Sequence, residues 1–223
     1  MQLPFTHDQF LDVFADYNRA LWPVLVLLWV LTVWALWRLY RGRAGSSRIL
    51  AIVLALHWAW SGVVYHWMFF HRINPVAALF GLGFLVQAAL LTWRGVVRTT
   101  VTFGPATNGW GWIGVALVAY ALFYPKIGWL FGLRFPRLPS FAVPCPTTLL
   151  TAGLLLLVPR PEARLLGVIP IVWAAIGGSA AFLLGIRADL ALPVAGGVLF
   201  AYLLTRGRPD AAQPNPALEL PRA

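Results

Sequence analysis

Charged residues are scarce in this sequence of 223 residues, and cysteine and lysine each occur only once. Charged side chains make up 11% of the chain, whereas a soluble globular domain carries about 25%. Hydrophobic residues make up 60%, and the mean hydropathy is +0.76. This composition excludes an ordinary soluble domain and indicates a membrane protein.

The rare residue types exclude several kinds of chemistry. The single cysteine, Cys145, excludes an internal disulfide and a CxxC redox pair. The single lysine, Lys126, follows Pro125 at the expected end of a helix, which argues against a retinal-binding lysine inside a span. The opening residues also lack the charged start, short apolar core and small-residue cleavage site of a signal peptide, so no removable signal is expected.

Basic residues outnumber acidic ones by 17 to 7, which gives a net charge of +10 and a pI near 11.0. In a soluble protein such an excess would suggest nucleic acid as a partner. Here the arginines form short clusters between apolar runs, so we expect no nucleic-acid binding. The expected partner is the lipid bilayer, and a homo-oligomer or a larger membrane complex is left open.

The apolar runs predict an all-α fold, a polytopic bundle of about seven transmembrane helices. The expected spans are 22–40, 49–70, 77–93, 110–124, a fifth that begins at 141 or 146 and ends at 158, then 165–184 and 190–204. If the fourth or fifth segment does not cross, six spans remain. The predicted organisation is an interfacial helix (1–21), the bundle (22–205) and a disordered, proline-rich cytoplasmic tail (206–223).

The first 21 residues have the pattern of an amphipathic helix. Thr6 and Gln9 have the spacing of a capping box. Large apolar side chains then recur on one helical face, and three aspartates recur every fourth residue on another: Phe10, Val13, Phe14, Tyr17 and Leu21, then Asp8, Asp12 and Asp16. This pattern predicts a helix that lies in the bilayer interface, and it favours a simple lid over an ion-binding row of carboxylates.

The basic residues also predict an orientation. With seven spans, one side of the membrane takes 11 of them: Arg38, Arg41, Arg43, Arg48, Arg94, Arg98, Arg160, Arg164, Arg206, Arg208 and Arg222. The other side takes six: Arg19, Arg72, Lys126, Arg134, Arg137 and Arg187. The positive-inside rule then puts the N-terminus outside and the C-terminus in the cytoplasm, with the protein in the inner (plasma) membrane.

Polar residues on the expected outer side are the candidate ligand-binding residues: His66, His71, Arg72, Cys145 and Asp189. Residues nine positions apart, such as His57 and His66, lie about 180° apart on a helix. His66 and His71 are five apart, which is also not the three-or-four spacing of helical ligand pairs. A metal or haem would therefore need ligands from other segments, and no metal, cofactor or catalytic residue is assigned.

Each of these residues also has a purely structural interpretation. His66 and His71 suit hydrogen bonding at the interface, whereas His57 and Gln87 suit hydrogen bonds between helices. Pro146 suits the first position of a helix, which puts Cys145 at or near the N-cap, either as a reactive thiol or as an inert packed side chain. Asp189 suits a cap of the last span. The small pairs Ala174/Gly178 and Gly177/Ala181 predict a close helix contact in the sixth span.

Several motifs carry a resemblance to a known family. They are Leu3-Pro4-Phe5-Thr6, Asp8-Gln9-Phe10, Val13-Phe14, Tyr17-Asn18, Trp22-Pro23, Tyr65-His66, Ile73-Asn74-Pro75, Pro144-Cys145-Pro146-Thr147-Thr148 and Gly177-Gly178-Ser179-Ala180-Ala181. Over residues 3 to about 205 the chain resembles an uncharacterised family of bacterial multi-pass membrane proteins, a domain of unknown function. Its members are sometimes labelled permeases. The resemblance implies a bacterial membrane protein and supplies no reaction, substrate or catalytic residue.

The sequence therefore favours a non-enzymatic integral membrane protein that binds or transports a small solute through an outward-facing polar site. One alternative is a membrane enzyme or a metal- or haem-binding protein that uses His66, His71 and Cys145. Another is a non-catalytic accessory subunit of a membrane complex.

The orientation can be tested with fusions to the C-terminus. A fluorescent protein fused after Ala223 should fluoresce, because that end is expected in the cytoplasm. Alkaline phosphatase fused at the same point should be inactive, and both fusions should be compared at equal expression. Active phosphatase would reverse the orientation.

Overall fold

A computed structural model describes residues 4–205, which fold into helices joined by short connections and contain no β-strand. The predicted disordered tail, 206–223, lies outside the described residues. The elements in order are α1 (His7–Tyr40), α2 (Ser46–Trp60), η1 (Ser61–Phe69), η2 (Phe70–Arg72), α3 (Ala77–Leu91), η3 (Thr92–Val97), α4 (Gly109–Leu122), α5 (Tyr124–Leu130), α6 (Pro144–Leu155), α7 (Arg160–Leu184), η4 (Arg187–Leu190) and α8 (Ala191–Leu204). The all-α class expected from the sequence is confirmed for these residues.

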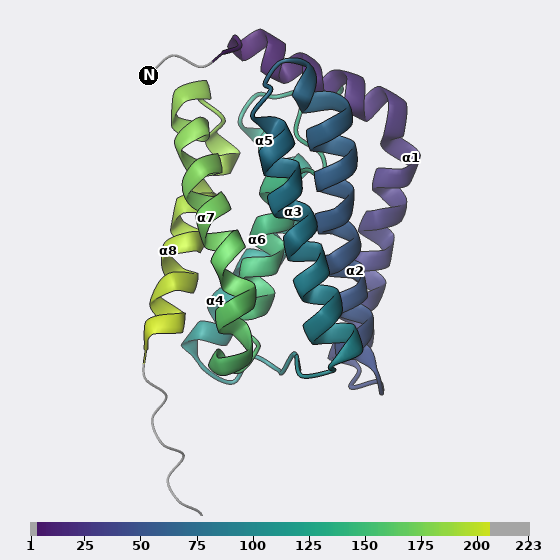
Figure 1. Ribbon diagram of the computed structural model, residues 1–223, viewed down its shortest axis with the longest axis vertical. Coiled ribbons are helices and arrows are strands. Elements are labelled where there is room, and N and C mark those ends of the chain that lie inside the picture. Colours follow the sequence, from purple (N-terminus) through teal and green to yellow (C-terminus); the bar gives the residue numbers. More distant parts are fainter. Residues whose placement is uncertain (1–3, 206–223) are drawn as a thin grey trace, which may run out of the picture.

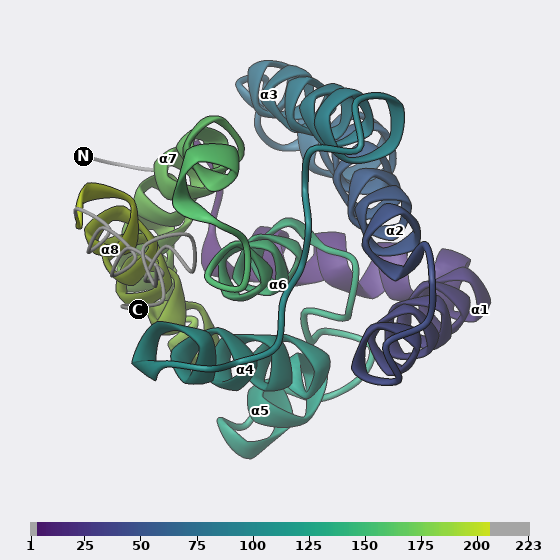
Figure 2. The same ribbon diagram turned by 90° about the horizontal axis from the view of Figure 1, so that it is seen from below.

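The long helices run in alternating directions and form a bundle around α6 (Figures 1 and 2). The first turns of α1 lie across one end of the bundle, which α5 and η4 share, and we call this the lid end. The other end holds the α1–α2 turn and the start of α7. We call it the arginine end, because it carries Arg38, Arg41, Arg43, Arg48, Arg94, Arg98, Arg160 and Arg164.

Within residues 4–205, five helical segments are long and apolar enough to cross a membrane: His7–Tyr40, Ser46–Arg72, Ala77–Val97, Arg160–Leu184 and Arg187–Leu204. A sixth span results if α4 and α5, which meet at a bend of 70°, are taken as one. The expected fifth span corresponds to α6, which has only 12 residues. Length and composition therefore support five or six spans, against the expected seven.

The central helix α6 contacts protein on every side. All its residues are buried except Cys145, which is partly buried. The closest approach is to α4, where a Cβ added to Gly153 would lie 2.6 Å from the carbonyl oxygen of Gly114 and 3.0 Å from the amide nitrogen of Val118. Glycine at this crossing lets the two backbones meet, as in small-residue helix contacts.

Small residues also bring α7 and α8 together. A Cβ on Gly178 would lie 2.7 Å from the ring of Pro193, and one on Gly177 would lie 3.0 Å from Leu192. On the α8 side, a Cβ on Gly196 would lie 2.6 Å from Ala174. The predicted close contact of the sixth span is therefore confirmed, and its partner is α8.

The capping box of the first helix is confirmed: the Gln9 amide donates to the Thr6 hydroxyl, and the Gln9 side chain accepts from the Thr6 amide. The helix does not end at residue 21, however, because α1 continues to Tyr40 with Pro23 inside it. The apolar face of its first turns packs on other aromatic side chains of the protein. Phe10 meets Phe70 at 5.9 Å and Phe14 meets Tyr65 at 5.7 Å between ring centroids.

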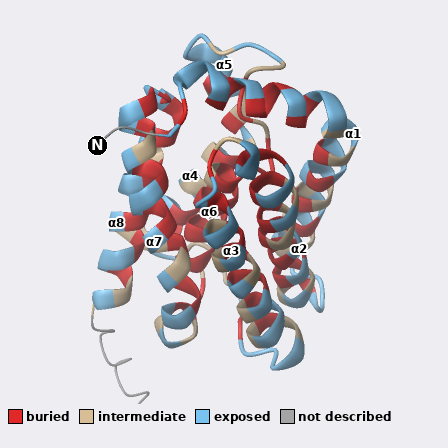
Figure 3. Cartoon of the chain, turned by 45° about the horizontal axis from the view of Figure 1, so that its top comes forward, coloured by how far each residue is buried: buried red, intermediate tan, exposed pale blue. Residues whose placement is uncertain are grey.

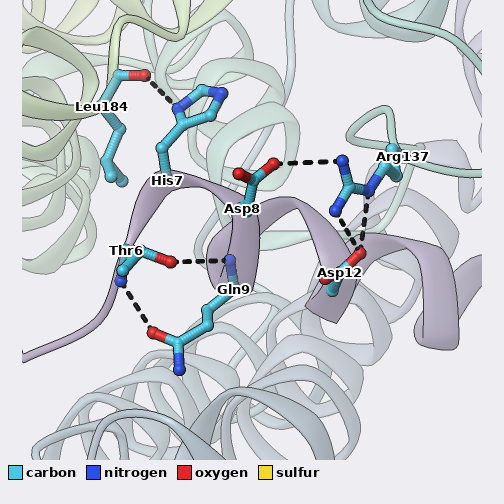
Figure 4. Close-up of polar contacts among 7 residues, drawn as sticks. All are labelled: Thr6, His7, Asp8, Gln9, Asp12, Arg137 and Leu184. Atoms are coloured by element: carbon cyan, nitrogen blue, oxygen red, sulfur yellow. Dashed lines mark hydrogen bonds and ion pairs between the residues drawn. The ribbon is translucent and has the colours of Figure 1, made fainter.

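The acidic face of α1 makes an ion pair with the chain between α5 and α6. Arg137 lies 3.1 Å from Asp8 and 2.6 Å from Asp12 (Figure 4). The hydrogen bond to Asp12, with that to Asp8, raises the pKa of the guanidinium above its ordinary value. These groups are largely exposed, so the pair orients the lid and contributes little to stability. Beneath it, the Asn18 amide donates to the carbonyls of Pro136 and Leu138.

The close crossing of α4 and α6 predicts that one added methyl group strongly destabilises the protein. Gly153→Ala should lower the melting temperature in detergent, because the added Cβ meets backbone atoms that cannot move aside. We expect a loss of about 1–3 kcal/mol. Gly83→Ala is the matched control, since a Cβ there meets nothing within 4 Å. Equal melting temperatures for the two variants would contradict the close crossing.

Candidate functional site

A buried carboxyl group lies at the lid end, where three elements meet. Asp189 of η4 is 4% exposed and accepts a hydrogen bond from the hydroxyl of Tyr124 in α5. The thiol of Cys145 in α6 faces the same carboxyl group. Within residues 4–205 the ion pairs are those of Arg137, so Asp189 has no cationic partner there. We call Asp189, Tyr124 and Cys145 the carboxyl cluster.

The local sequence explains how the cluster forms. The helix α6 begins at Pro144, after the N-cap Val143, so Cys145 lies in the first helical turn and is not the cap. The expectation that Pro146 starts the helix is wrong by two residues, because Pro144 is equally suited to a first turn. Asp189 does not cap α8 either, since the cap position is Leu190 and has no side-chain hydrogen bond. Its carboxyl group accepts from Tyr124 instead.

The chain that enters α6 is fixed by hydrogen bonds from two other helices. The carbonyl oxygen of Ala142 accepts from the hydroxyl of Tyr17 at 3.3 Å and from that of Ser61 at 3.0 Å. Ala142 has a φ of +67°, a conformation that costs energy for a residue with a Cβ. The two donors, on α1 and η1, hold this strained residue and with it the start of α6.

His66 faces a different interface. Its ring is completely buried and lies 4.8 Å from the ring of Phe84 and 5.1 Å from that of Trp173, measured between centroids. Neither of its ring nitrogens has a hydrogen-bond partner within residues 4–205, and neither has Nε1 of Trp173. His66 therefore lies among aromatic rings of α3 and α7 and does not contribute a hydrogen bond to Asp189.

His71 and Arg72 are exposed at the lid end. The guanidinium of Arg72 lies 5.1 Å from the ring centre of Phe69 and lines a small hollow of about 140 Å³ with Asp12 and Asp16. Of the five candidate residues, the structure brings Cys145 and Asp189 together and leaves the other three apart from them. Within residues 4–205, no three His, Cys, Asp or Glu side chains gather closely enough to hold a metal ion.

Two other buried polar residues have the structural role expected from the sequence. Nε2 of His57 lies 2.8 Å from the hydroxyl of Thr32, which joins α2 to α1. The amide of Gln87 donates to the carbonyl of Leu166 at 2.9 Å, which joins α3 to α7. The prediction that both residues hold neighbouring helices together is confirmed.

A large cavity lies at the arginine end, opposite the carboxyl cluster. It has a volume of about 1130 Å³ and lies between the inner half of α4, the end of α1, the start of α2 and the segment that joins η3 to α4. Its lining is Leu36, Leu39, Tyr40, Gly42, Arg43, Gly45, Ser46, Ser47, Arg48, Gly95, Thr99, Val101, Thr102, Phe103, Gly104, Pro105, Ala106, Trp112, Val115, Val118, Leu154 and Leu157. Ligand pockets usually occupy about 300–1,000 Å³, so this one is large.

The lining has two parts with different chemistry. Aliphatic side chains of α1, α4 and α6 form the inner walls, and Arg43 and Arg48 lie at the rim. No acidic residue lines it. The sequence did not predict this cavity, since its lining comes from separated segments and no local motif marks it. The arginine-rich α1–α2 turn was the one available signal, and it was interpreted only as a marker of orientation.

Comparison with known proteins identifies the family to which this chain belongs. A family model described as a family of unknown function, DUF6064, matches residues 7–212. No curated protein and no solved structure matches the chain. The resemblance to an uncharacterised family is thereby confirmed, and the match assigns no role to the carboxyl cluster or to the cavity.

The carboxyl cluster predicts coupling between two buried side chains. Tyr124→Phe should destabilise the protein by about 1–3 kcal/mol, because the buried carboxyl group loses its donor. In a double-mutant cycle with Asp189→Leu, the double variant should be more stable than the sum of the two single losses predicts. Thermal unfolding in one detergent measures all four proteins. Tyr40→Phe, at a residue that is 88% exposed, is the control and should have no effect. Additive losses would mean that the two residues act independently.

Proposed function

We propose that this chain, which belongs to the DUF6064 family of unknown function, is an integral membrane protein. We propose further that it binds an apolar or amphiphilic small molecule in the cavity at the arginine end. The observation that carries this proposal is the cavity itself, with its volume of about 1130 Å³ and its aliphatic walls. We assign it a binding role, without catalysis.

The distribution of exposed side chains supports membrane insertion. The outward faces of the long helices are exposed (Figure 3). Large apolar residues lie on these faces, among them Val26, Leu27 and Val30 on α1, Leu79, Leu82 and Val86 on α3, Val168 and Val172 on α7, and Val194 and Phe200 on α8. Cations lie over aromatic rings at both ends: Arg38 over Trp34, Arg41 over Trp37 and Arg94 over Trp93 at one, and Lys126 over Trp129 and Arg72 over Phe69 at the other. Such pairs are typical of the two interfaces of a bilayer.

We further propose seven crossings, with α6 as the fifth. The alternating direction of the helices supports this count, because α6 runs from the lid end to the arginine end between α4 and α7 (Figure 1). A crossing helix that touches only protein does not need the length or the apolarity of one that faces lipid. With the N-terminus outside, the arginine end faces the cytoplasm, as the positive-inside rule favours.

The carboxyl cluster receives a structural role in this proposal. Tyr124, Cys145 and Asp189 join α5, α6 and η4 at the outer face, close to where the sequence predicted a polar site. The sequence suggested a solute-binding site at the outer face. We assign this binding role to the cavity at the arginine end instead, because the cavity offers the volume that a ligand needs.

Photolabelling tests the proposed function. A long-chain alkyl alcohol with a diazirine on its chain should label the cavity walls in phosphatidylcholine nanodiscs, and mass spectrometry should locate the label near Val115, Leu154 and Leu157. Val115→Trp should reduce labelling of the other wall residues several-fold, because the indole takes up the space beside them.

Ile113→Trp is the matched control. Ile113 lies on the same helix, is similarly exposed and does not line the cavity, so its replacement should leave wall labelling unchanged. A label confined to lipid-facing positions such as Val26 and Val30, with none on the walls, would rule out the proposed function.

A further inference from the structure

We infer that the cavity occupant is an anionic phospholipid, with its phosphate between Arg43 and Arg48 and an acyl chain along α1 and α4. This inference rests on the proposed function and adds the chemical class of the ligand. Four features of the cavity carry it: the free cations at its rim, the start of α2, the apolar walls and the aromatic side chains at its mouth.

The rim of the cavity has cations without partners. Within residues 4–205, the guanidinium groups of Arg43 and Arg48 make no hydrogen bond, ion pair or aromatic contact, and both residues are exposed. Their neighbours are already engaged: Arg38 donates to the carbonyl of Ala44, and Arg41 lies over Trp37. Two unpaired guanidinium groups at one opening suit a phosphate, which accepts hydrogen bonds from both.

The start of α2 adds further donors to the same rim. The helix begins at Ser46 after Gly45, which supplies no side-chain cap. The amides of Ser47 and Arg48, in its first turn, donate to no acceptor within residues 4–205. Both residues line the cavity. The positive end of a helix dipole with free amides favours an anion, and here it acts together with the two arginines.

The remaining lining favours a lipid over a small polar anion. Below the rim the walls are Leu36 and Leu39 of α1, Val115 and Val118 of α4, and Leu154 of α6, which offer no polar group to a free phosphate. Tyr40 and Trp112 are 88% and 64% exposed at the mouth, where aromatic side chains mark the level of lipid headgroups. An acyl chain would occupy the walls while the phosphate stays at the rim.

The acidic residues are distributed in agreement with this assignment. Within residues 4–205, four of the five carboxylates belong to the lid end: Asp8, Asp12, Asp16 and Asp189. The fifth, Glu162, lies in the first turn of α7 and does not line the cavity. The rim is therefore purely cationic, which favours an anionic headgroup over a zwitterionic one.

The test compares two lipids that differ only in the headgroup, one anionic and one zwitterionic. Phosphatidylglycerol and phosphatidylcholine with the same diazirine on one acyl chain are added in turn to the protein in phosphatidylcholine nanodiscs, and label on Val115, Val118 and Leu154 is quantified. We expect a clear preference for phosphatidylglycerol that falls by about fivefold for each arginine removed in Arg43→Gln and Arg48→Gln. A variant with lysine in place of both Arg43 and Arg48 should keep most of the preference for phosphatidylglycerol.

Arg41→Gln is the control for charge at the membrane surface. Arg41 lies in the same turn but does not line the cavity, so this variant should keep the preference. The exposed positions of all three arginines make folding defects unexpected, and melting temperatures verify this.

The outcomes separate the two proposals. Equal wall labelling by both lipids in the unmodified protein would overturn the anionic assignment while leaving the proposed function standing. No wall labelling by either lipid or by the alkyl alcohol would overturn both. Loss of the preference on addition of inorganic phosphate, at constant ionic strength, would assign the rim to a free anion and overturn the lipid assignment.

Discussion

The central position of α6 is the constraint on which the rest of the structure depends. A helix enclosed by other helices must bury its polar side chains with partners, because an unpaired buried group is costly. Thr148 and Thr151 donate to carbonyls of the preceding turn, and Thr151 also accepts from Nε1 of Trp58 at 2.8 Å. The glycines at the α4 crossing then let the neighbouring backbone approach closely. These contacts explain how a 12-residue helix occupies the centre of the bundle.

The lid end follows from the need to fix the start of α6. The chain between α5 and α6 has no regular structure over 131–140, so its backbone groups need partners from elsewhere. The first turns of α1 provide them: Asn18 and Tyr17 donate to carbonyls of this segment, and Asp12 pairs with Arg137. The same turns bury their phenylalanines on η1 and η2. The lid is thus a structural part of the bundle, and its Asp8 and Asp12 are paired with a basic residue of the protein.

Periodicity and local motifs predicted the features that depend on neighbouring residues in the chain. The capping box at Thr6 is of this kind. Residue type also predicted that His57 and Gln87 bond to another helix and that α7 makes a close helix contact. The partners in such contacts between distant segments were not predictable. The amphipathic face of α1 indicated burial but could not distinguish lipid from protein as its partner. The cluster of Asp189 with Tyr124 depends on the 70° bend between α4 and α5. In the sequence, Pro125 indicates only that a helix ends there.

The cavity has a physical origin in the way α1 and α4 diverge. Near α5 the two helices touch, since Nε1 of Trp29 donates to the carbonyl of Leu122 at 3.1 Å. Toward the arginine end α4 stays with α6 at the glycine crossing, whereas α1 stays with α2. The space between them is then lined by α6 at its inner side and by the connection from η3 to α4 at its end. Closing it would require α4 to leave α6 or α1 to leave α2. The packing that holds α6 at the centre therefore keeps an apolar space open beside Arg43 and Arg48.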